Sequence, residues 1–594
     1  MALMQISNVY KSFSGVDLFK DISFNINEKD KIGLIGINGA GKSTLIKILL
    51  GEEEPDINPN TRTQGVITKS SGLKIGYLSQ HSNLNQENTV LEELSKTIEI
   101  GEDYKISMAL EEVSLGESFL DNKISTLSGG QQTKVALCKI LLNDTALLIL
   151  DEPANHLDLE AIEWLESFLK NYKKAFLLIS HDKYFLDNTV HRIFEIEAKT
   201  LKTYKGNYSD FVIQKEIILS GALKAFDKEQ EQIKNLEEFV AKYKAGQRAK
   251  QARGRQKFLD RMARAENPVI NNKTMRLQFT VDTPSTKKVL EIKNLAKSFG
   301  DNLLFQNFNL NLEKGSSIAL IGRNGVGKST ILKIINSLEN YDSGEVSFGE
   351  KLRVGYFDQH HKGLYLENTV LEEIINNFDV KEEMARGLLS QFLFSGDDVF
   401  KKVKSLSGGE RARVSLLKLI LQKPNFLILD EPTNHLDIYS REILENAFAD
   451  YEGTILAVSH DRSFLNNVVD KLCVIDKFKT FYFAGSYDEY VAQRDLNINK
   501  PAVKKAAKHA ETSNTEIVNL VKENLNLEKK LKKLDAEEKN LQSSMEKAGI
   551  ANNLEELINL QSKIEDINAK MLQIIESIDK NEKEIIAFDV ADKI

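Results

Sequence analysis

Cysteine, proline and long apolar runs are all scarce in this sequence. The 594 residues include two cysteines, Cys138 and Cys473, and eight prolines. Two cysteines in separate, apolar surroundings predict buried free thiols rather than a disulfide or a metal site. So few prolines argue against extensive disorder. No apolar run approaches the ~18 residues that a membrane helix needs, so we predict no membrane span.

The composition and the first residues favour an intracellular location. Hydrophobic residues make up 41% and charged residues 28% of the chain, and the formal net charge is −8. The opening MALMQISNVYKSF has no basic segment followed by an apolar stretch, so we expect no signal peptide. The simplest prediction is a cytoplasmic protein.

Four motifs occur twice in the same order. The first copy contains GINGAGKS (36–43), LSGGQ (127–131), LLILDEPANHLD (147–158) and LLISHD (177–182). The second contains GRNGVGKS (322–329), LSGGE (406–410), FLILDEPTNHLD (426–437) and LAVSHD (456–461). A lone GxxxxGKS string is a moderate signal, but two complete sets are close to decisive for a nucleotide-driven protein.

The spacing of the copies predicts four domains. The glycine loops lie 286 residues apart and the later motifs 279 apart, so the first copy has seven extra residues before Gln80. Copies of roughly 200 residues have ordinary domain sizes. We predict domains at 1–208 and 288–495, a linker at 209–287 and a tail at 496–594.

Each GxxxxGKS motif lies between an apolar strand and a helix. Glycines let backbone N–H groups approach phosphates, and the helix N-terminus adds positive potential. Lys42 and Lys328 are predicted to bridge the β- and γ-phosphates, and Ser43 and Ser329 to bind Mg²⁺. The predicted ATP-binding residues here are Gly36, Asn38, Gly39, Gly41, Lys42, Ser43 and Thr44, and Gly322, Asn324, Gly325, Gly327, Lys328, Ser329 and Thr330.

Each copy also has a short apolar run that ends in two acids. Such a run is typical of a parallel strand buried on both faces. Asp151 and Asp430 are predicted to hold Mg²⁺ through water. Glu152 and Glu431 are the candidate bases that orient or deprotonate the attacking water.

Further polar and aromatic candidates lie at strand ends. His181 and His460 follow apolar strands and are predicted to reach the γ-phosphate, the alternative being a structural role. Gln80 and Gln359 also end strands and are predicted to coordinate Mg²⁺ or water. Phe13 and Phe299 each precede the first glycine of their loop by 23 residues, which suits stacking on adenine; core packing is the alternative.

LSGG precedes a helix in both copies, which makes a second helix start suited to anions. One domain does not easily bring both helix starts to one nucleotide, so we predict head-to-tail pairing within a monomer. Lys42 would then face Ser407, and Lys328 would face Ser128, so that ATP closes the pair and hydrolysis opens it. The predicted ATP-binding residues of this motif are Ser128, Gly129 and Gly130, and Ser407, Gly408 and Gly409.

These motifs resemble the ATP-binding cassette superfamily over about 400 residues, and the tandem layout with NHLD resembles its ABC-F group. The resemblance implies an α/β fold of two P-loop ATPase domains joined by a helical-hairpin linker. It also implies a cytoplasmic ATPase that uses ATP and Mg²⁺, binds the large subunit of the ribosome, and regulates or rescues translation. In that family the linker touches tRNA near the peptidyl-transferase centre. The two copies differ at equivalent positions: the first has Ala154 where the second has Thr433, and Lys134 where the second has Arg413. These differences leave open whether the two sites are equivalent.

The predicted linker combines an apolar seam with a basic segment. Leu219, Phe226, Ile233 and Val240 recur every seven residues, as in a helix with one apolar seam. Residues 242–264 carry nine basic side chains against one Asp, a local charge of +8 that favours a polyanion, the alternative being a solvated helical face. Gly246 and Gly254 suggest the hairpin turn, and the amino-acid sequence of this segment is similar to linkers of the Uup-type branch. The predicted RNA contacts are Lys242, Lys244, Arg248, Lys250, Arg253, Arg255, Lys257, Arg261 and Arg264.

The tail carries two heptad stretches separated by AGIANN, which predicts an antiparallel coiled coil. Such a tail also resembles the Uup branch, where it is linked to nucleic-acid binding; a dimerisation or purely structural role is the alternative. The seams are Leu520, Leu527, Leu534 and Leu541, then Leu557, Ile564, Met571, Ile578 and Ile585.

Two other functions stay open from sequence. One is the ATPase of a membrane transporter whose membrane subunits are separate chains, although a basic hairpin has no obvious task there. The other is a DNA-associated ATPase, although chromosome-structuring types separate half-cassettes by hundreds of residues. Two cysteines exclude the zinc-dependent repair type and the iron–sulfur ribosome-recycling relative.

Overall fold

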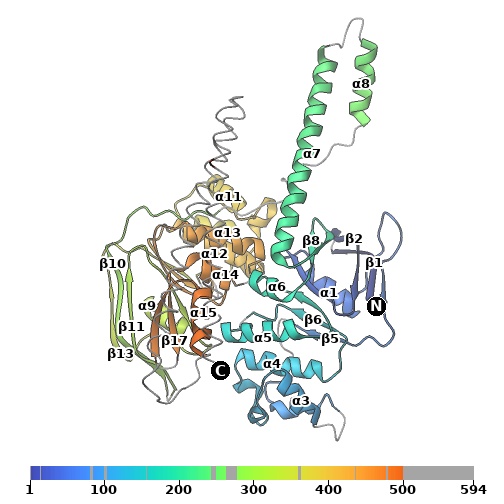
Figure 1. Cartoon of the computed structure of the whole chain (residues 1–594). Coiled ribbons are helices and arrows are strands. Elements are labelled where there is room, and N and C mark those ends of the chain that lie inside the picture. The colour runs from blue at the N-terminus through green and yellow to red at the C-terminus, as the bar shows by residue number, and fades with distance from the viewer. Residues whose placement is uncertain are drawn as a thin grey trace. The chain divides into compact units, whose positions relative to one another are not determined.

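A computed structural model of the chain (Figure 1) forms two compact units, Met1–Arg494 and Asp495–Ile594. It describes residues 2–498 apart from 14, 80–83, 99–103, 156, 243–248, 262–276, 301, 359–362, 435 and 477–478, and in the tail residue 563. The heptads of the predicted coiled coil therefore lie outside the described residues, apart from Lys563, which is helical. The proposed domain boundaries stay a prediction.

A six-stranded sheet carries the first set of motifs. Its order is β5-β6-β7-β3-β8-β9, in which only β9 runs antiparallel to its neighbour. The central strands are buried along their length, as expected of parallel strands covered on both faces. The strands are β3 (Lys31–Gly36), β5 (Ile75–Leu78), β6 (Leu147–Asp151), β7 (Ala175–Ile179), β8 (Arg192–Glu197) and β9 (Thr200–Lys205).

The second copy repeats this sheet. The order β14-β15-β16-β12-β17-β18 matches the first strand by strand, with β18 antiparallel at the edge. The strands are β12 (Ser317–Ile321), β14 (Val354–Phe357), β15 (Phe426–Asp430), β16 (Thr454–Val458), β17 (Lys471–Asp476) and β18 (Lys479–Ala484). The two predicted α/β ATPase folds are confirmed.

A three-stranded antiparallel sheet accompanies each larger sheet. The orders are β2-β1-β4 and β11-β10-β13, and the long strands of Figure 1 belong to these sheets. Their alternating buried and exposed side chains are typical of a sheet with one covered face. The strands are β1 (Ala2–Phe13), β2 (Val16–Asn27), β4 (Val66–Lys69), β10 (Lys288–Phe299), β11 (Asn302–Glu313) and β13 (Ser343–Phe348).

The helices of the first copy and of the second correspond in the same way. Those of the first are α1 (Lys42–Leu50), α2 (Val90–Ser95), α3 (Tyr104–Glu112), α4 (Gly129–Leu141), α5 (Leu159–Asn171) and α6 (Lys183–Thr189), with short 3₁₀ turns η1 (Glu117–Phe119) and η2 (Ile124–Thr126). Those of the second are α9 (Lys328–Ile335), α10 (Val370–Ile375), α11 (Glu382–Gln391), α12 (Gly408–Leu421), α13 (Ile438–Ala449), α14 (Arg462–Val468) and α15 (Tyr487–Ile498), with η3 (Gly396–Phe400) and η4 (Val403–Ser405).

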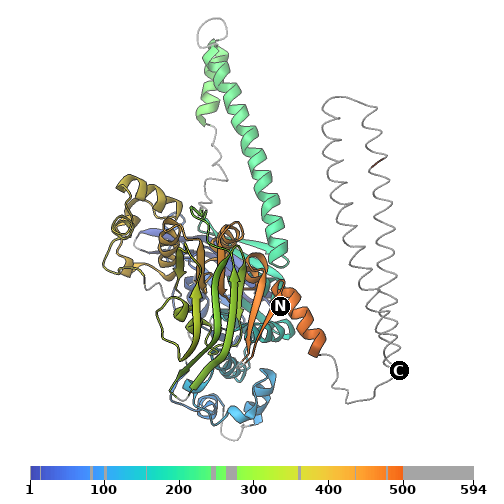
Figure 2. The ribbon, with the colours of Figure 1, turned by 90° about the vertical axis from the view of Figure 1, so that its left-hand side faces the viewer.

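Two helices of the linker lie side by side, as Figures 1 and 2 show. α7 (Tyr208–Lys242) contains the predicted heptad seam, and its Ile233 is buried. α8 (Ala249–Arg261) contains Gly254, so the expectation that Gly254 marks the hairpin turn is wrong. A glycine in a helix lacks a side chain but does not by itself end the helix. Gly246 lies outside the described residues.

The described residues form two apolar core clusters in each copy, and one cluster of each copy includes one residue of the other copy. Leu159, at the start of α5, belongs to the core cluster of the second copy. Ile438, at the equivalent start of α13, belongs to that of the first. The copies therefore pack reciprocally through the residue that follows each NHLD motif. Cys138 and Cys473 are buried free thiols, as predicted. Among the described helices, none combines the length and apolar character needed to cross a bilayer.

Candidate nucleotide sites

Both glycine loops have a backbone that only glycine adopts easily. Gly41 and Gly327 each have φ of +95° and immediately precede α1 and α9. A Cβ atom at Gly41 would lie 2.7 Å from the Phe19 ring, and one at Gly327 would lie 2.8 Å from the Phe305 ring. The glycines therefore let the loops turn tightly over an aromatic side chain and leave the helix N-terminus open to an anion.

The two motif lysines lie folded over these loops. Lys42 Nζ donates to Gly36 O at 2.8 Å, and Lys328 Nζ donates to Gly322 O at 2.7 Å. Lys42 is 8% exposed and Lys328 is 6% exposed. Burial lowers the pKa of both ammonium groups, although nearby carboxylates act in the opposite direction. A buried cation satisfied by loop carbonyls fits a site for phosphate.

The predicted magnesium ligands come together in pairs. Ser43 Oγ lies 3.5 Å from Asp151 Oδ2, and Ser329 Oγ donates to Asp430 Oδ1 at 3.0 Å. Burial, followed by the charge of Glu152, raises the pKa of Asp151 to about 6. Hydroxyl and carboxylate oxygens are the donors that Mg²⁺ prefers, so these pairs fit the ion. Gln80 and Gln359 lie outside the described residues, just beyond β5 and β14.

The candidate bases have a strained backbone. Glu152 and Glu431 have φ of 49° and 50°, a left-handed conformation that costs a non-glycine residue roughly 1–2 kcal/mol. Their N–H groups donate to Ile179 O at 3.0 Å and Val458 O at 2.9 Å, which anchors the strained peptide to the neighbouring strand. Strain held in place at equivalent positions is typical of functional sites.

The surroundings of the two glutamates differ. Glu152 accepts from the side chain of Asn155, and His181 Nε2 lies 3.3 Å from its Oε1. Burial raises the pKa of Glu152, but His181, Lys42 and Arg441 together bring it to about 2. Asn155 and Arg441 were not among the sequence-predicted residues; the repeated NHLD motif is the signal that draws attention to Asn155.

Glu431 has fewer partners. Its Oε2 accepts from the His460 N–H at 3.3 Å, and its Oε1 is buried without a hydrogen-bond partner among the described residues. Burial, with the charge of Asp430, raises the pKa of Glu431 to about 8. His460 Nε2 lies 3.7 Å from Oε1, and burial lowers the pKa of His460 to about 3.

The glycine loop of each copy contacts the NHLD motif of the other. Asn38 N–H donates to Asp437 Oδ2 and Asn324 N–H donates to Asp158 Oδ2, both at 3.2 Å. Asp158 and Asp437 also cap the N-termini of α5 and α13. Neither aspartate was predicted as a site residue, because a motif does not reveal which domain its side chain will meet.

Among the cavities where the copies meet, two contain motif residues predicted to bind ATP. One, of about 460 Å³, is lined by Asn38, Gly39, Glu152 and His181 from the first copy and by Ser407, Gly408, Gly409, Glu410 and Arg413 from the second. The structure thus brings the first glycine loop and the second LSGG motif to one space. Ser407 caps α12 by accepting from Glu410 N–H, so this motif does begin a helix.

The second cavity, of about 490 Å³, surrounds the other glycine loop. Its lining includes Asn324, Gly325, Gly327, Lys328, Ser329, Thr330, Phe299, Glu431 and His460, together with Glu152, Asn155 and His181 of the first copy. Ser128, Gly129 and Gly130 do not line this cavity; Ser128 caps α4. That Lys328 faces Ser128 across ATP stays a prediction. The cavities differ in composition although the motifs correspond.

The two predicted adenine-stacking rings are half exposed. Phe13 is 49% and Phe299 51% exposed, which is unusual for core phenylalanines. Lys11 Nζ lies 5.5 Å from the Phe13 ring centroid and Lys297 Nζ lies 4.7 Å from that of Phe299. An exposed ring face suits stacking on a base.

Comparisons with known proteins give the family. Models described as ABC transporter match residues 19–155 and 305–434, and a further model with this description matches 194–279. ABC transporter F family member 5 of Arabidopsis thaliana is 35% identical over 538 residues, which cover 82% of this chain and 77% of the relative. The chain belongs to the ABC-F family. It is an ATPase with two ATP-binding-cassette domains.

Two further similarities are informative. The energy-dependent translational throttle protein EttA of Escherichia coli K12 is 34% identical over 539 residues, covering 82% of this ABC-F chain and 94% of EttA. A structure described as a model of ribosome-bound archaeal Pelota and ABCE1 has a TM-score of 0.56 and 22% identity, covering 82% and 80% of the two chains. The second similarity shows a shared fold.

Proposed function

We propose that this ABC-F ATPase binds the ribosome in its ATP-closed state, contacts tRNA or rRNA through the basic linker, and regulates or rescues translation. The similarity to EttA, whose name describes a translational throttle, supports a role in translation. The basic helix α8 is the observation in this chain that carries the proposal.

Helix α8 presents cations on an otherwise acidic protein. Arg253 and Lys257 are exposed, and the Arg255 guanidinium carbon lies 3.7 Å from the centroid of the Phe239 ring on α7. This stacking fixes one cation on the hairpin and leaves others open to solvent. Exposed guanidinium and ammonium groups bind phosphates of RNA.

The rest of the basic segment is only partly described. Lys242 ends α7, and Lys250 and Arg261 lie in α8, although the side chains of the latter two are not described. Lys244, Arg248 and Arg264 lie outside the described residues. They stay predicted RNA contacts.

Within the cassettes, we assign the chemistry to the paired residues. Lys42 and Lys328 bind the phosphates, Glu152 and Glu431 orient or deprotonate the attacking water, and His181 and His460 contact the γ-phosphate. Ser43 with Asp151, and Ser329 with Asp430, would hold Mg²⁺, which would neutralise phosphate charge. ATP between the first glycine loop and the Ser407–Gly409 segment draws the cassettes together, and hydrolysis releases them.

Co-sedimentation with purified ribosomes tests the proposal. The Glu152→Gln/Glu431→Gln protein should pellet with ribosomes in ATP but not in ADP. Lys250→Glu, Arg253→Glu and Lys257→Glu, introduced together, should weaken this binding by about tenfold or more, because each lost phosphate contact removes a salt-dependent contribution. Arg255 is kept so that the contact with Phe239 is preserved.

A matched variant controls for net charge. Lys224→Glu, Lys228→Glu and Lys234→Glu make the same charge change on exposed positions of α7. This variant should bind clearly better than the α8 variant. Equal loss in both variants contradicts recognition by α8, and ATP-independent or absent ribosome binding contradicts the proposed function and returns attention to transport or DNA maintenance.

A further inference from the structure

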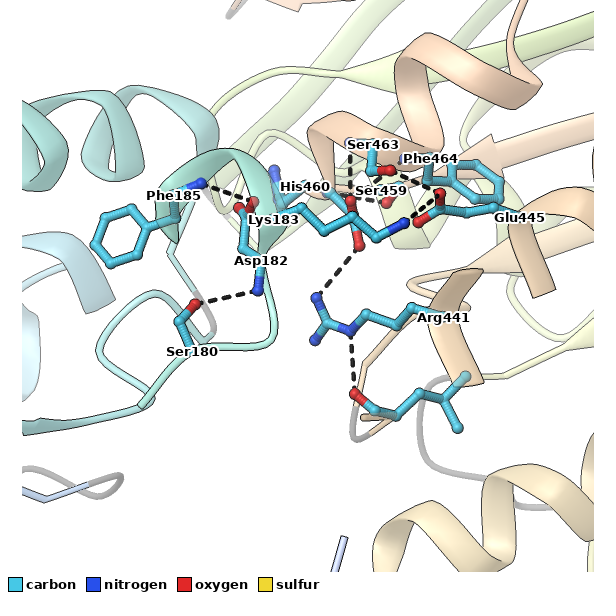
Figure 3. A network of polar contacts seen from close by, with 12 residues as sticks. Ser180, Asp182, Lys183, Phe185, Arg441, Glu445, Ser459, His460, Ser463 and Phe464 are labelled. Carbon is cyan, nitrogen blue, oxygen red and sulfur yellow. Dashed lines mark hydrogen bonds and ion pairs between the residues drawn. The ribbon is translucent and has the colours of Figure 1, made fainter. Parts of the chain in front are cut away.

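One of the described arginines at the cassette interface, Arg441, lies between the histidine loops of the two cassettes. Arg441, one turn into α13, is buried and lines the 490 Å³ cavity together with Glu152, His181, Asp182, His460 and Asp461. Figure 3 shows its side chain reaching towards the loops of both cassettes. Its Nε donates to Leu436 O at 3.1 Å and its Nη1 donates to Asp461 Oδ2 at 3.2 Å. Its Nη2 makes no hydrogen bond to the described residues.

The two aspartates beside the histidines are buried acids. Asp182 follows His181 and accepts from Phe185 N–H at 3.0 Å, so it caps α6. Asp461 follows His460 and accepts from Ser463 N–H at 2.9 Å, so it caps α14. Burial, with the charge of Asp461, raises the pKa of Asp182. Two buried carboxylates that repel each other need a positive charge nearby.

Two other cations, Arg462 and Lys183, lie nearby. Arg462 Nη1 lies 3.0 Å from both carboxylate oxygens of Glu166, across the cassette interface, and its Nε and Nη2 have no hydrogen-bond partner among the described residues. The charge of Arg462 lowers the pKa of Asp182 more than the charge of Arg441 does. Lys183 lies 3.8 Å from Glu442 and 3.9 Å from Glu445. Arg441 donates a hydrogen bond to Asp461, and Asp182 lines the same cavity as Arg441.

Arg441 has no counterpart in the first cassette. The 279-residue offset that relates the later motifs places Ile162 at the equivalent position of α5, and Ile162 lines the same cavity. One guanidinium therefore faces both histidine loops at an interface that is otherwise duplicated.

We propose that Arg441 is a positioning residue for both ATP sites, because it is, together with Arg462, a counter-ion of the buried pair Asp182 and Asp461 and holds the two histidine loops against each other when the cassettes close. This rests on the proposed roles of His181 and His460 at the γ-phosphate. Without the guanidinium, repulsion between the aspartates separates the loops that carry the histidines. Each site then depends on the presence of the other cassette.

ATP-induced closure of the full chain is the direct test. Cysteines at Met108 and Met384, which are 64% and 61% exposed, accept a donor–acceptor dye pair, while Cys138 and Cys473 are buried. Energy transfer is titrated with ATP in the Glu152→Gln/Glu431→Gln protein, so that hydrolysis does not enter. Arg441→Met should raise the ATP concentration for half-closure by about tenfold, as expected for an uncompensated buried charge.

Rescue distinguishes charge from packing. Adding Asp182→Asn to Arg441→Met should return half-closure to within about threefold of the parent, because Asn removes the repelling charge and still caps α6. Arg441→Lys keeps the charge but not the guanidinium fork, so its half-closure concentration should lie between those of the parent and Arg441→Met. Arg494→Met, which removes a 2.9 Å contact to Glu163 between the same cassettes, is the control that Asp182→Asn should not rescue.

Normal closure by Arg441→Met overturns the inference, and so does a defect that Asp182→Asn fails to repair. Thermal unfolding measured on the same proteins shows whether the Arg441→Met variant still folds. If this variant does not fold, the inference stands only if adding Asp182→Asn restores folding. A chain that closes with ATP but does not bind ribosomes contradicts the proposed function alone.

Discussion

Glu152 in the first cassette and Glu431 in the second occupy equivalent positions, yet their carboxyl groups have different neighbours. Glu152 accepts from Asn155, lies 3.3 Å from His181 and feels the charge of Arg441. Glu431 has one buried oxygen without a partner among the described residues. The pKa is about 2 for Glu152 and about 8 for Glu431.

Backbone geometry is duplicated, but electrostatics is not. The sheets, the glycine loops and the strained φ of both glutamates repeat because the motifs repeat. The charge around Glu152 includes Arg441 of the second cassette, whereas the groups that act on Glu431 belong to its own cassette. The first cassette has Ile162 at the position equivalent to Arg441. Duplicated motifs therefore do not ensure equivalent sites.

The largest expected effect comes from removing both bases. Glu152→Gln with Glu431→Gln should lower hydrolysis by about 100-fold or more, because general-base catalysis is lost while the phosphate loops remain. Steady-state phosphate release measures hydrolysis, and a fluorescent ATP analogue verifies binding. The two single variants should retain unequal activities. Near-parental turnover in the double variant contradicts the assignment, and equal single variants contradict the asymmetry.

The two predicted adenine-stacking rings should respond alike to substitution, in contrast to the two glutamates. Phe13→Ala and Phe299→Ala should each weaken ATP binding by roughly fivefold at the affected site, since one stacking interaction is worth about 1 kcal/mol. Equilibrium binding in chains with only one functional glycine loop measures each site. Tyr at the same positions is the control that should keep affinity. Unchanged affinity in the Ala variants supports core packing instead.

The pH dependence of stability should separate the glutamates. The pKa of Glu431 in the fold lies above its ordinary 4.5, so its stabilisation is full below that value and is lost as pH rises through about 8. In EDTA without nucleotide, Glu431→Gln should remove part of the fall in Tm between about pH 6.5 and about pH 9, with roughly 2–4 °C for each kcal/mol.

Glu152→Gln is the matched control for this measurement. The pKa of Glu152 lies below its ordinary value, so its stabilisation is present above about pH 4.5 and is lost as pH falls through about 2. The slope of Tm between about pH 6.5 and about pH 9 should therefore match the parent. Identical slopes in all three proteins contradict the difference between the sites.

The smallest effect is expected from the tail. Truncation after residue 500 should change basal ATP hydrolysis by less than about twofold, because the described residues around both cavities lie within Met1–Arg494. Turnover and Tm of the truncated chain measure this. Residues 512–594 alone should give a strongly helical circular dichroism spectrum, as the heptads predict. Loss of cassette folding on truncation contradicts an autonomous tail.

Local patterns predicted most of what lies within one cassette. The strands ending in Asp151 and Asp430, the helices that begin after the glycine loops, and the pairing of Ser43 with Asp151 follow from short motifs. The prediction that Gly254 lies in the hairpin turn was wrong, because a glycine can be helical when the residues on either side favour a helix. Lysines folded onto their own loops were not predicted, since loop carbonyls leave no mark in the sequence.

Contacts between the cassettes were harder to predict. Head-to-tail pairing was expected from the two helix starts, and one cavity does combine Gly39 with Ser407. The sequence did not indicate that Asp158 and Asp437 would contact the opposite loops, or that Leu159 and Ile438 would enter the opposite cores. These contacts depend on how two surfaces meet, to which residues hundreds of positions apart contribute.

The sequence by itself determined two ATPase cassettes, their phosphate loops and acidic strands, and a basic linker, because spacing and residue type dictate local backbone and ligand chemistry. Only the tertiary structure decided that Glu152 has Asn155 and His181 beside it, whereas Glu431 has one oxygen without a partner among the described residues. It also placed one arginine between two buried aspartates. Burial and distance set these electrostatic differences, and both arise only when the chain has folded and its two halves have packed.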